Sequence, residues 1–426
     1  MYYKLRGVLV KEIRRLWYNF GLMYCQRLTL KDFRNYRRLD LSLSPGLTIF
    51  QGENASGKTT LLEALYLLAT TKSPRAGSDQ ELVSFEAEAE FGAPAFARLA
   101  GTVERQDGEI EAEILVLRDQ TGPEVGQAGT ARKRIKVNGT PRRSIDLIGK
   151  INVVLFSPED LDLIIGSPSL RRRYLDSTLS QVDHRYLRHW QDYAKVVAQR
   201  NGFLRNVRER QGRGRVTGRD EMSIWNVELV KNGAYLIKRR QEALQNLNNL
   251  AASLHGQLTG LVSALIPEPN TGFELVYQPS FDLQGATDET EIAARFEARL
   301  NEVRSQELQR GVSLAGPHRD DFAFMVEDAN ISTYGSRGQQ RTAVLALKLA
   351  EVGWMHAQTG DRPILLLDDI LSELDAHRRQ YVLDTVQARA EQVLITTTDL
   401  AFFGDQATLR ELATLYEVEF GTVKRV

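Results

Sequence analysis

The sequence contains very little cysteine, and it lacks long hydrophobic runs. Cys25 is the only cysteine among 426 residues. No intramolecular disulfide can form, which excludes a disulfide-stapled extracellular scaffold and favours a reducing compartment. The longest stretch without a charged side chain, residues 243–267, is interrupted by Gln, Asn and His and is too polar to cross a bilayer. Residues 1–22 lack a signal-peptide pattern, because charged side chains interrupt any apolar core. We therefore expect a cytoplasmic protein without a membrane segment.

The chain also lacks a net charge, since 55 Lys and Arg balance 55 Asp and Glu. A balanced charge usually argues against a nucleic-acid partner, but here the charges are unevenly distributed. Bases exceed acids in residues 1–40, 131–150 and 169–219, whereas acids exceed bases in residues 78–127. This separation favours charge steering by one face of the molecule, although an ordinary solvated surface would give the same pattern.

Length and composition indicate an ordinary globular protein. At about 150 residues per domain, the chain is long enough for two or three domains with ample core. Its 42% hydrophobic and 26% charged residues exclude disordered and collagen-like chains.

The N-terminal part predicts strands and one helix. Residues 39–43 alternate between apolar and polar side chains and residues 47–50 form a short apolar run, so we expect two adjacent strands. Further expected features are a helix at 57–69, strands within 86–136, a Gly-rich loop at 120–129 and a two-residue hairpin turn at Asn138-Gly139.

The middle of the chain, from about 166 to 301, has long helical periodicity. Leucines step by three and four residues, which indicates a core stripe more strongly than a dimer zipper. Strand-like and helical segments return after residue 314, with buried-strand runs at 364–367 and 393–396. The stepping leucines are Leu244, Leu247, Leu250, Leu254, Leu258, Leu261 and Leu265, and a basic Gly-rich loop is expected at 210–218.

Residues 52–59, GENASGKT, satisfy the phosphate-loop pattern GxxxxGK[ST] between a predicted strand and a predicted helix. Glycines let backbone N–H groups close around phosphate oxygens, and the helix N-terminus adds its positive end. Lys58 would reach the β- and γ-phosphates as a catalytic cation, and the Thr59 hydroxyl would ligate Mg²⁺. The predicted nucleotide contacts are Gly52, Glu53, Asn54, Ala55, Ser56, Gly57, Lys58, Thr59 and Thr60.

A fully apolar run ends in two carboxylates, Asp368 and Asp369. Asp368 would hold the Mg²⁺ shell as a Walker-B acid does. Asp369 would orient or deprotonate the attacking water. An acidic pair after an apolar strand is a weak signal alone, but it becomes strong together with a phosphate loop about 300 residues earlier.

Ser336, Gly338 and Gln339 begin an apolar-periodic helix and have the Ser-x-Gly-Gln core of an ABC-type signature. Such a segment forms a second anion site that faces the nucleotide of another subunit. The alternative is a helix N-cap by Ser336, which contributes about 1 kcal/mol. The signature is favoured because Ser372–Asp375 follows the acidic pair at the distance of a D-loop, with Asp375 as its nucleotide-side residue.

Together these motifs resemble the RecF family, bacterial recombination mediators related to SMC-type ABC ATPases. The resemblance extends over residues 23 to about 424. Besides the motifs above, the matching stretches are Leu30–Tyr36, Lys136–Gly139, Phe156–Leu161, Gly166–Asp176, Tyr193–Asn201 and Gly316–Asp321.

The resemblance implies an ATP-dependent DNA-binding protein acting at single-strand gaps, with ATP and Mg²⁺ as cofactors. Its implied partners are single-stranded or gapped DNA, the proteins RecO, RecR and RecA, and a second copy of the chain in an ATP-dependent homodimer. The implied roles are gap repair, replication restart and SOS induction. Arg34 and Asn35 match a strand turn that lies near the nucleotide in SMC-like heads, although a hydrated hairpin would look the same.

Some positions depart from the family pattern. Asp369 stands where related ATPases usually have Glu, which suggests slow turnover. The resemblance as a whole implies a weak DNA-stimulated ATPase. Thr398 stands near the position of the switch histidine, so no His-assisted mechanism is expected, and His318 is expected to be structural. Residues 1–22 have no counterpart in the family, which leaves an upstream start codon or a cationic tail as alternatives.

Basic side chains and aromatics are interleaved in the helical part, where DNA could bind. Basic side chains attract phosphates without reading sequence, and aromatic side chains can stack on nucleobases. The aromatic residues have helical spacing, however, so packing in the core explains them equally well. The predicted DNA contacts are Arg171, Arg172, Arg173, Arg185, Arg188 and Lys195, beside Tyr174, Tyr186, Trp190 and Tyr193.

We therefore expect an α/β fold, an ABC-type (SMC-like) P-loop ATPase head with an inserted helical lobe. Two alternatives are a nucleotide-gated clamp that scarcely hydrolyses ATP and the nucleotide-binding subunit of an ABC transporter. The missing switch histidine and the inserted lobe argue against the transporter. The predicted division is an extension at 1–22, the first part of the head with an antiparallel β subdomain at 23–166, the lobe at 167–312 and the second part of the head at 313–426.

Overall fold

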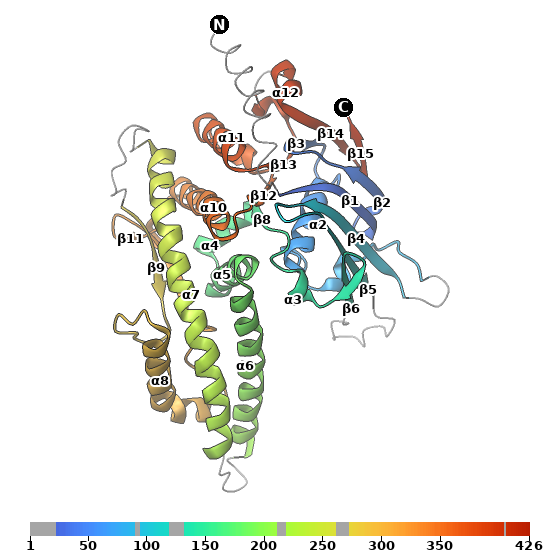
Figure 1. Cartoon of the computed structure of the whole chain (residues 1–426). Helices are drawn as coiled ribbons and strands as arrows, with labels where there is room; N and C mark the ends of the chain where they lie inside the picture. The colour runs from blue at the N-terminus through green and yellow to red at the C-terminus, as the bar shows by residue number, and fades with distance from the viewer. Residues whose placement is uncertain (1–22, 90–93, 119–131, 211–218, 261–271, 404–405) are drawn as a thin grey trace. The chain divides into compact units, whose positions relative to one another are not determined.

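The computed structural model describes residues 23–89, 94–118, 132–210, 219–260, 272–403 and 406–426. The chain forms two compact units, one from Met1–Pro158 with Met355–Val426 and the other from Glu159–Trp354 (Figure 1). The first unit is thus built from both ends of the chain. The second is larger than the lobe expected at 167–312, because it also includes the signature segment and most of the helix that follows it.

A six-stranded, mostly parallel sheet forms the base of the first unit. Its strand order is β15-β14-β3-β13-β12-β8, and only β15 is antiparallel to its neighbour. Every residue of β12 and β13 is buried, as expected for central parallel strands with apolar sequences. The strands are β3 Gly46–Gln51, β8 Val153–Phe156, β12 Ile364–Asp368, β13 Gln392–Thr397, β14 Ala413–Glu419 and β15 Thr422–Arg425.

A second, antiparallel sheet belongs to the same unit and has the order β2-β1-β4-β5-β6-β7. Helix α2, Lys58–Thr70, contacts strands of both sheets (Figure 1). It is therefore buried on most of its circumference, including Leu61, Leu65 and Leu68. The strands are β1 Tyr24–Phe33, β2 Tyr36–Ser42, β4 Phe96–Glu104, β5 Ile110–Leu117, β6 Arg132–Val137 and β7 Thr140–Arg142.

One strand prediction was wrong and others are confirmed. Residues 39–43 and 47–50 were expected to form adjacent strands, but β2 and β3 belong to different sheets. Their burial explains why: β2 buries alternate residues, whereas β3 buries four in succession and lies inside the parallel sheet. The predicted helix is α2, and the hairpin turn is confirmed by positive φ values of 51° at Asn138 and 70° at Gly139. The loop at 120–129 lies outside the described residues.

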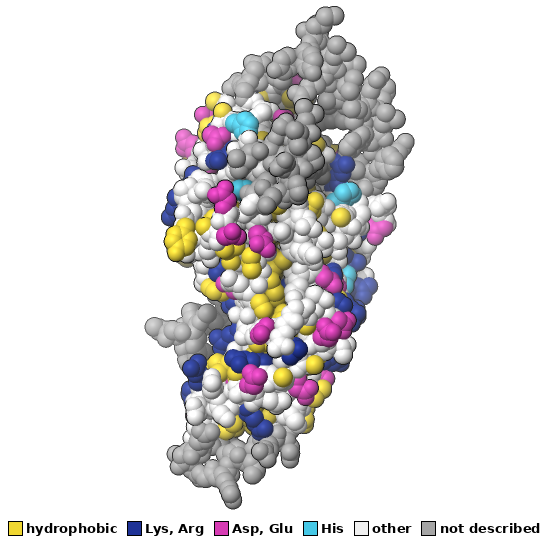
Figure 2. Space-filling view, turned by 90° about the vertical axis from the view of Figure 1, so that its left-hand side faces the viewer, with side chains coloured by type: hydrophobic (Ala, Val, Ile, Leu, Met, Phe, Trp, Pro, Cys, Tyr) yellow, Lys and Arg dark blue, Asp and Glu magenta, His cyan; other side chains and the backbone are white. Residues whose placement is uncertain are grey.

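The face of the antiparallel sheet away from α2 carries paired charges. Glu113 from the acidic region accepts from Arg98 at 2.6 Å and pairs with Lys136 of the basic hairpin at 3.0 Å. Acidic and basic regions that are separate in the sequence thus meet across neighbouring strands. On the face drawn in Figure 2, the dark blue and magenta side chains are likewise interspersed.

The second unit is mainly helical. Helices α6, His184–Arg210, and α7, Arg219–Thr259, lie side by side, and α7 also contacts α8, Glu289–Arg310 (Figure 1). The leucine stripe is a core stripe where it is described: Leu244, Leu247, Leu254 and Leu258 are buried, whereas Leu250 is 37% exposed. Leu261, Leu265 and the basic loop at 211–218 lie outside the described residues.

A three-stranded antiparallel sheet, in the order β11-β10-β9, completes the second unit, and short helices connect the larger elements of both units. Among the described residues, no helix is both long and apolar enough to cross a membrane. The remaining elements are α3 Ser144–Leu147, α4 Asp162–Ile165, α5 Pro168–Val182, β9 Phe273–Gln278, β10 Asp321–Val326, β11 Ala329–Asn330, α9 Ile331–Tyr334, α10 Arg337–Thr359, α11 Ala376–Arg389 and α12 Gln406–Leu412. Short 3₁₀ turns occupy Asp79–Leu82, Pro158–Leu161, Ile370–Glu373 and Leu400–Phe403.

A buried ion pair holds helices α6 and α8 together. Arg200 and Glu307 are both fully buried, and their closest N–O distance is 2.5 Å. Arg200 also donates to Ser313 Oγ at 2.7 Å and to Asn226 Oδ1 at 3.1 Å. A buried guanidinium needs its countercharge, because an unpaired buried charge is strongly destabilising.

We expect Glu307→Ala to destabilise the second unit by about 3–5 kcal/mol, because it leaves Arg200 buried and unpaired. Glu302→Ala on the same helix breaks an exposed pair with Arg299 and should change stability by less than about 1 kcal/mol. Urea unfolding followed by tryptophan fluorescence measures this, since Trp190, Trp225 and Trp354 all lie in this unit. Equal effects of the two substitutions would contradict the importance of the pair.

Candidate nucleotide-binding site

The phosphate loop connects β3 to α2, as its sequence predicts. Its two glycines occupy positions that no side chain fits. A Cβ on Gly52 would lie 2.3 Å from the Val418 carbonyl oxygen, and one on Gly57, where φ is +114°, would lie 2.5 Å from Asn35 Nδ2. Ala55 also has a positive φ of 63°. The backbone is therefore held close to its neighbours in a conformation that depends on glycine.

Neighbouring turns hold the loop from behind. The Ser56 carbonyl oxygen accepts from Asn35 Nδ2 at 3.2 Å and from the Gly421 backbone N–H at 3.1 Å. The Gly57 carbonyl oxygen accepts from the Tyr36 hydroxyl at 3.1 Å. These contacts use carbonyl oxygens, while the first N–H groups of a helix have no partner within the helix and attract anions.

Lys58 lies across the loop. Its Nζ donates to the Gly52 carbonyl oxygen at 2.8 Å and to that of Glu53 at 2.7 Å. Burial lowers the pKa of Lys58, against the opposing attraction of Asp369 and Asp368. An ammonium has three N–H donors, so the side chain can hold the loop and still donate to a phosphate oxygen.

Asp368 joins the loop to the neighbouring strands. Its Oδ1 accepts from Thr59 Oγ1 at 2.8 Å and from Thr396 Oγ1 at 2.7 Å, and its side chain is buried. Strand β13, which ends at Thr397, lies between β3 and β12 in the sheet, so Thr396 lies on the strand between those that lead into the two motifs. The Thr59 hydroxyl and Asp368 carboxylate, predicted as Mg²⁺ ligands, are therefore in direct contact.

Asp369 has a strained backbone and a partly unsatisfied side chain. Its φ is +49°, and its backbone N–H donates to Thr396 Oγ1 at 3.0 Å. Burial, together with Asp368 and Glu373, raises the pKa of Asp369, whereas Lys58 lowers it. A carboxyl group with a raised pKa beside a cation and a second carboxylate is typical of acid–base sites.

The residues present fit a nucleotide with Mg²⁺. Ser56 Oγ and Asp369 Oδ1 are buried without a hydrogen-bond partner in the described part of the chain, and both belong to the predicted motifs. Mg²⁺ usually takes one or two carboxylates together with phosphate oxygens and water, which matches one hydroxyl and one or two Asp side chains. When bound, the nucleotide would supply the phosphate oxygens that complete this coordination.

The signature segment has the geometry of a capped helix start. Ser336 Oγ accepts from the Gln339 backbone N–H at 3.3 Å, while Gln339 Oε1 accepts from the Ser336 backbone N–H at 2.8 Å. This reciprocal pair is a capping box at the start of α10. Ser336 and Gln339 are exposed, and a Cβ on Gly338 would meet nothing nearer than Ser336 Oγ at 4.0 Å. The N-cap interpretation is confirmed, and it leaves this exposed end open to an anion.

Three other predicted residues are found at turns. Asp375 caps α11 by accepting from the Arg378 backbone N–H at 2.9 Å and is exposed. Asn35 contacts the phosphate loop, as described above. The Arg34 guanidinium is instead held by Glu63 at 2.8 Å and by the Glu81 carbonyl oxygen at 3.0 Å. In this structure Arg34 therefore contacts α2 and the turn at residue 81.

The predicted DNA contacts divide into buried and exposed groups. Arg171 is buried, pairs with Asp321 at 2.7 Å and donates to three backbone carbonyl oxygens. Its prediction as a DNA contact was wrong, because its guanidinium is fully used inside the protein. Arg172 is half-buried and donates to the Asp320 carbonyl oxygen at 2.7 Å. The remaining predicted contacts are exposed: Arg173, Arg185, Arg188 and Lys195.

The aromatic side chains of this region are mostly structural. Tyr186 and Tyr193 are buried, and Trp190 Nε1 donates to Asp176 Oδ2 at 2.9 Å. Tyr174 is half-buried under the Lys348 ammonium, which lies 5.1 Å from its ring centre. The alternative that these aromatics belong to the core is confirmed for Tyr186 and Tyr193. His318 bonds to the Tyr193 hydroxyl at 2.7 Å, and burial lowers its pKa to about 4, as suits a structural imidazole.

Some site residues were missed by sequence reasoning. Thr396 contacts both acidic residues, whereas the sequence predicted only a buried strand at 393–396. Tyr36, Glu63 and Gly421 support the loop or the turn beside it. A strand-end threonine on a sheet that contains both motifs was the one available signal. The other three were not predictable, because their roles depend on contacts between distant segments.

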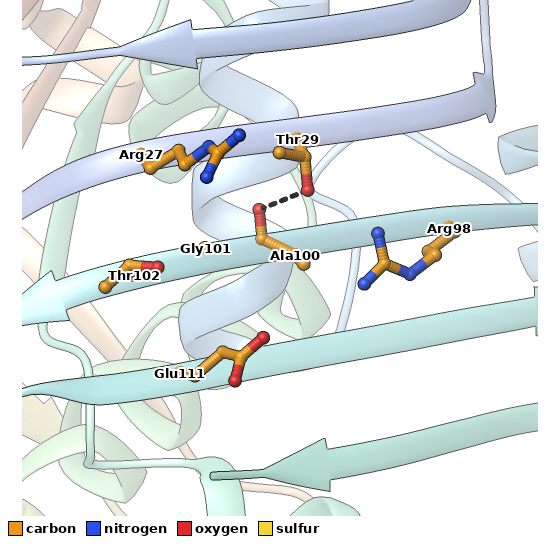
Figure 3. A pocket seen from close by; sticks show the side chains of 7 residues that line it. All are labelled: Arg27, Thr29, Arg98, Ala100, Gly101, Thr102 and Glu111. Carbon is orange, nitrogen blue, oxygen red and sulfur yellow. Dashed lines mark hydrogen bonds between the residues drawn. The ribbon is translucent and has the colours of Figure 1, made fainter. Parts of the chain in front are cut away.

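A depression of about 250 Å³ lies on the antiparallel sheet (Figure 3). Figure 3 shows Arg27 and Arg98 on either side of it, with Glu111 on the next strand. Arg27 is paired with Asp40 and Arg98 with Glu113. Both guanidinium groups therefore have carboxylate partners, and we assign no ligand to this depression.

Comparison with known proteins agrees with the site. The family model described as RecF/RecN/SMC N terminal domain matches residues 24–422. The chain is 45% identical over 382 residues to the DNA replication and repair protein RecF of Herpetosiphon aurantiacus, covering 89% of this chain and 94% of that protein. It is 46% identical over 403 residues to the protein of the same name from Chloroflexus aurantiacus, covering 94% and 99%.

Solved structures agree with these sequence relatives. The structure of the recombination mediator protein RecF-ATPrS in the RecFOR pathway matches with a TM-score of 0.80 and 30% identity, covering 96% of this chain and 99% of that one. The Smc head domain from Pyrococcus furiosus, at 16% identity and a TM-score of 0.50, shows a shared fold alone. The predicted ABC-type, SMC-like α/β fold is therefore confirmed, and the chain belongs to the RecF family of DNA replication and repair proteins.

Proposed function

We propose that the protein is an ATP-dependent DNA-binding protein of recombinational gap repair, in which ATP and Mg²⁺ join two heads around single-stranded or gapped DNA. The observation that carries the proposal is the contact between the phosphate loop and Asp368, with unsatisfied polar groups around it, in a chain of the RecF family. The proposal includes a cytoplasmic location and cooperation with RecO and RecR in loading RecA, with roles in replication restart and SOS induction. Family membership leaves the transporter alternative without support.

Head pairing follows from what one nucleotide site provides. Lys58, Thr59 and the two Asp residues would contact the phosphate chain from one molecule only. The exposed start of α10 offers the Ser336 hydroxyl, the Gly338 N–H and the positive helix end to the γ-phosphate held by a second copy. Gln339 and Asp375 would border the same interface. Nucleotide shifts the equilibrium towards the pair because its γ-phosphate is contacted from both sides only in the pair.

Asn35 and Arg34 would act beside the nucleotide in different ways. Asn35 positions the loop through the Ser56 carbonyl oxygen. Arg34 is held by Glu63 in this structure, so a contact with nucleotide would require it to leave that partner. We therefore assign Asn35 to the site directly and Arg34 to the turn that carries it.

We assign DNA binding to exposed basic side chains of the second unit. These are chiefly Arg173 on α5 and Arg185, Arg188 and Lys195 on α6. These side chains attract phosphates without reading bases, as a gap-binding protein requires. Two of them have partial partners: Lys195 pairs with exposed Asp192, and Arg185 stacks over the Tyr235 ring at 4.4 Å. Exposed pairs contribute little and can exchange for DNA phosphates.

A protein that binds ATP but scarcely hydrolyses it is the second candidate. Asp369 is a shorter base than Glu, and its strained backbone fixes where its carboxylate can reach. Its raised pKa nevertheless suits the acceptance of a proton from water. We favour weak hydrolysis that releases the pair, with a non-hydrolysing clamp as the alternative.

The first test separates ATP binding from head pairing. We expect Lys58→Ala to weaken ATP binding at least about tenfold, because it removes charge-assisted hydrogen bonds. Ser336→Arg should leave ATP binding unchanged but abolish ATP-dependent dimerisation, because it blocks the second anion site. Calorimetry measures binding, and the molecular mass in solution with and without ATP·Mg²⁺ measures pairing.

The control for this test is Lys31→Ala, which removes an exposed ammonium beside the Phe96 ring on the antiparallel sheet. It should change neither ATP binding nor pairing. Unchanged dimerisation of Ser336→Arg would contradict the paired-head proposal, and unchanged ATP affinity of Lys58→Ala would contradict the site itself.

The second test concerns hydrolysis. We expect Asp369→Asn to retain ATP binding and to lower turnover on the order of 10²-fold, because it removes the base. Since the pKa of Asp369 is raised, the base form is lost as pH falls through a value above that of an ordinary carboxyl group. Wild-type turnover should therefore decline at higher pH than an ordinary aspartate would give. Steady-state phosphate release against pH measures both, and equal rates of wild type and variant would favour the clamp.

A further inference from the structure

The turn between β14 and β15 contains an aromatic side chain where small polar residues are preferred. Glu419 pairs with Thr422, so Phe420 and Gly421 form a two-residue hairpin loop. Both have positive φ, 42° for Phe420 and 78° for Gly421. Such turns favour Asn, Asp or Gly at the first position, because a bulky residue is strained there.

Three other two-residue hairpins in the described part of the chain have polar residues in this turn, and the one between β1 and β2 is Arg34-Asn35, with a φ of 53° at Arg34. The turn between β6 and β7 is Asn138-Gly139, with φ values of 51° and 70°. The turn between β10 and β11 is Glu327-Asp328, with φ values of 50° and 64°. Phe420 is the large apolar exception, and it is 92% exposed, so it gains no burial that would offset the strain. An outlier of this kind points to a function.

The same turn is fixed to the phosphate loop. The Gly421 backbone N–H donates to the Ser56 carbonyl oxygen at 3.1 Å, and a Cβ on Gly421 would lie 2.4 Å from the Asn35 carbonyl oxygen. At the end of β14, the Val418 carbonyl oxygen lies against Gly52. The hairpin therefore contacts both ends of the loop, which gives Phe420 a fixed place beside it.

The order of strands shows which end of a nucleotide lies near Phe420. Asp368 ends β12 and Asp369 follows it. Strand β12 lies two strands from β3 on one side, whereas β14 adjoins β3 on the other (Figure 1). Thr59 and Asp368 would hold Mg²⁺, and with it the β- and γ-phosphates, on the β12 side of the loop. The base end of such a nucleotide would then lie on the β14 side.

From these contacts we propose that Phe420 is the stacking platform for the base of the bound nucleotide, and this inference rests on the proposed ATP site. An aromatic ring held at the edge of the loop offers a face to the planar base. Stacking of this kind tolerates different bases but requires that a base be present.

The local charge argues against a DNA backbone as the partner of Phe420. Glu417 and Glu419 are both exposed on the strand that leads to the turn. Lys424 on β15 lies opposite Glu417 and Arg425 follows Lys424, so the hairpin has no excess of positive charge that would attract a polyphosphate backbone. The ring is therefore better suited to the base end of a nucleotide than to phosphates.

The test compares ATP with inorganic tripolyphosphate, which has the phosphate chain without a base. Calorimetric titrations in Mg²⁺ give the dissociation constants for wild type and Phe420→Ala. We expect the substitution to weaken ATP binding by roughly 5- to 100-fold, the range of base stacking on an aromatic side chain. Tripolyphosphate affinity should stay the same within about twofold, because the phosphate loop is intact.

Two further variants keep the test independent of folding. Phe420→Asn places a preferred residue in the turn, so it should raise the melting temperature while weakening ATP binding as much as Phe420→Ala does. Phe85→Ala removes another exposed Phe, 96% exposed, and should change neither ligand's affinity.

The outcomes are distinguishable. If wild type binds ATP but Phe420→Ala and Phe420→Asn bind it equally well, the platform is excluded and the proposed ATP site stands. If both variants lose ATP and tripolyphosphate to the same degree, Phe420 supports the loop and does not contact the base. If wild type binds neither ligand, the proposed function itself fails, and this inference fails with it.

Discussion

The hydrogen bond from Thr59 to Asp368 joins residues 309 positions apart, and the candidate site depends on it. The parallel sheet makes this contact possible, because β3, β13 and β12 end at the same edge. Thr396, on β13, donates to the Asp368 carboxylate and accepts from the backbone N–H of Asp369. The site therefore exists only after both ends of the chain have formed one sheet. The large helical insertion between them is compatible with this requirement, because it belongs to a separate compact unit.

The parts of the site that were predictable are those that lie within one short segment. The phosphate loop, its helix and the acidic pair have fixed local spacing and fixed local chemistry, so the sequence identifies them. The supports of the loop come from the β1–β2 turn, the β14–β15 turn and β13, and no local pattern reports such contacts. Arg171 was mispredicted for the same reason. Its sequence pattern is that of an exposed basic side chain, and only the position of Asp321 explains its burial.

For the fold as well, features within one segment were predictable, whereas the pairing of separate segments was not. Helix α2, the Asn138-Gly139 turn and the buried leucines follow from periodicity and turn chemistry, and the structure confirms them. The assignment of β2 and β3 to neighbouring positions failed because strands that follow one another need not pair. The balanced charge of the chain also has a structural counterpart: the acidic and basic regions meet on one sheet, where Glu113 lies between Arg98 and Lys136.

In the proposed function, ATP controls DNA binding by pairing two heads. The most direct measurement is the affinity of the wild-type protein for gapped, single-stranded and duplex DNA, each with and without ATP·Mg²⁺, over a range of salt concentrations. We expect ATP to strengthen binding to gapped DNA most and the affinity to fall steeply as salt increases, because phosphate contacts dominate. Equal affinity with and without ATP, or an affinity that does not change with salt, would contradict the proposed function.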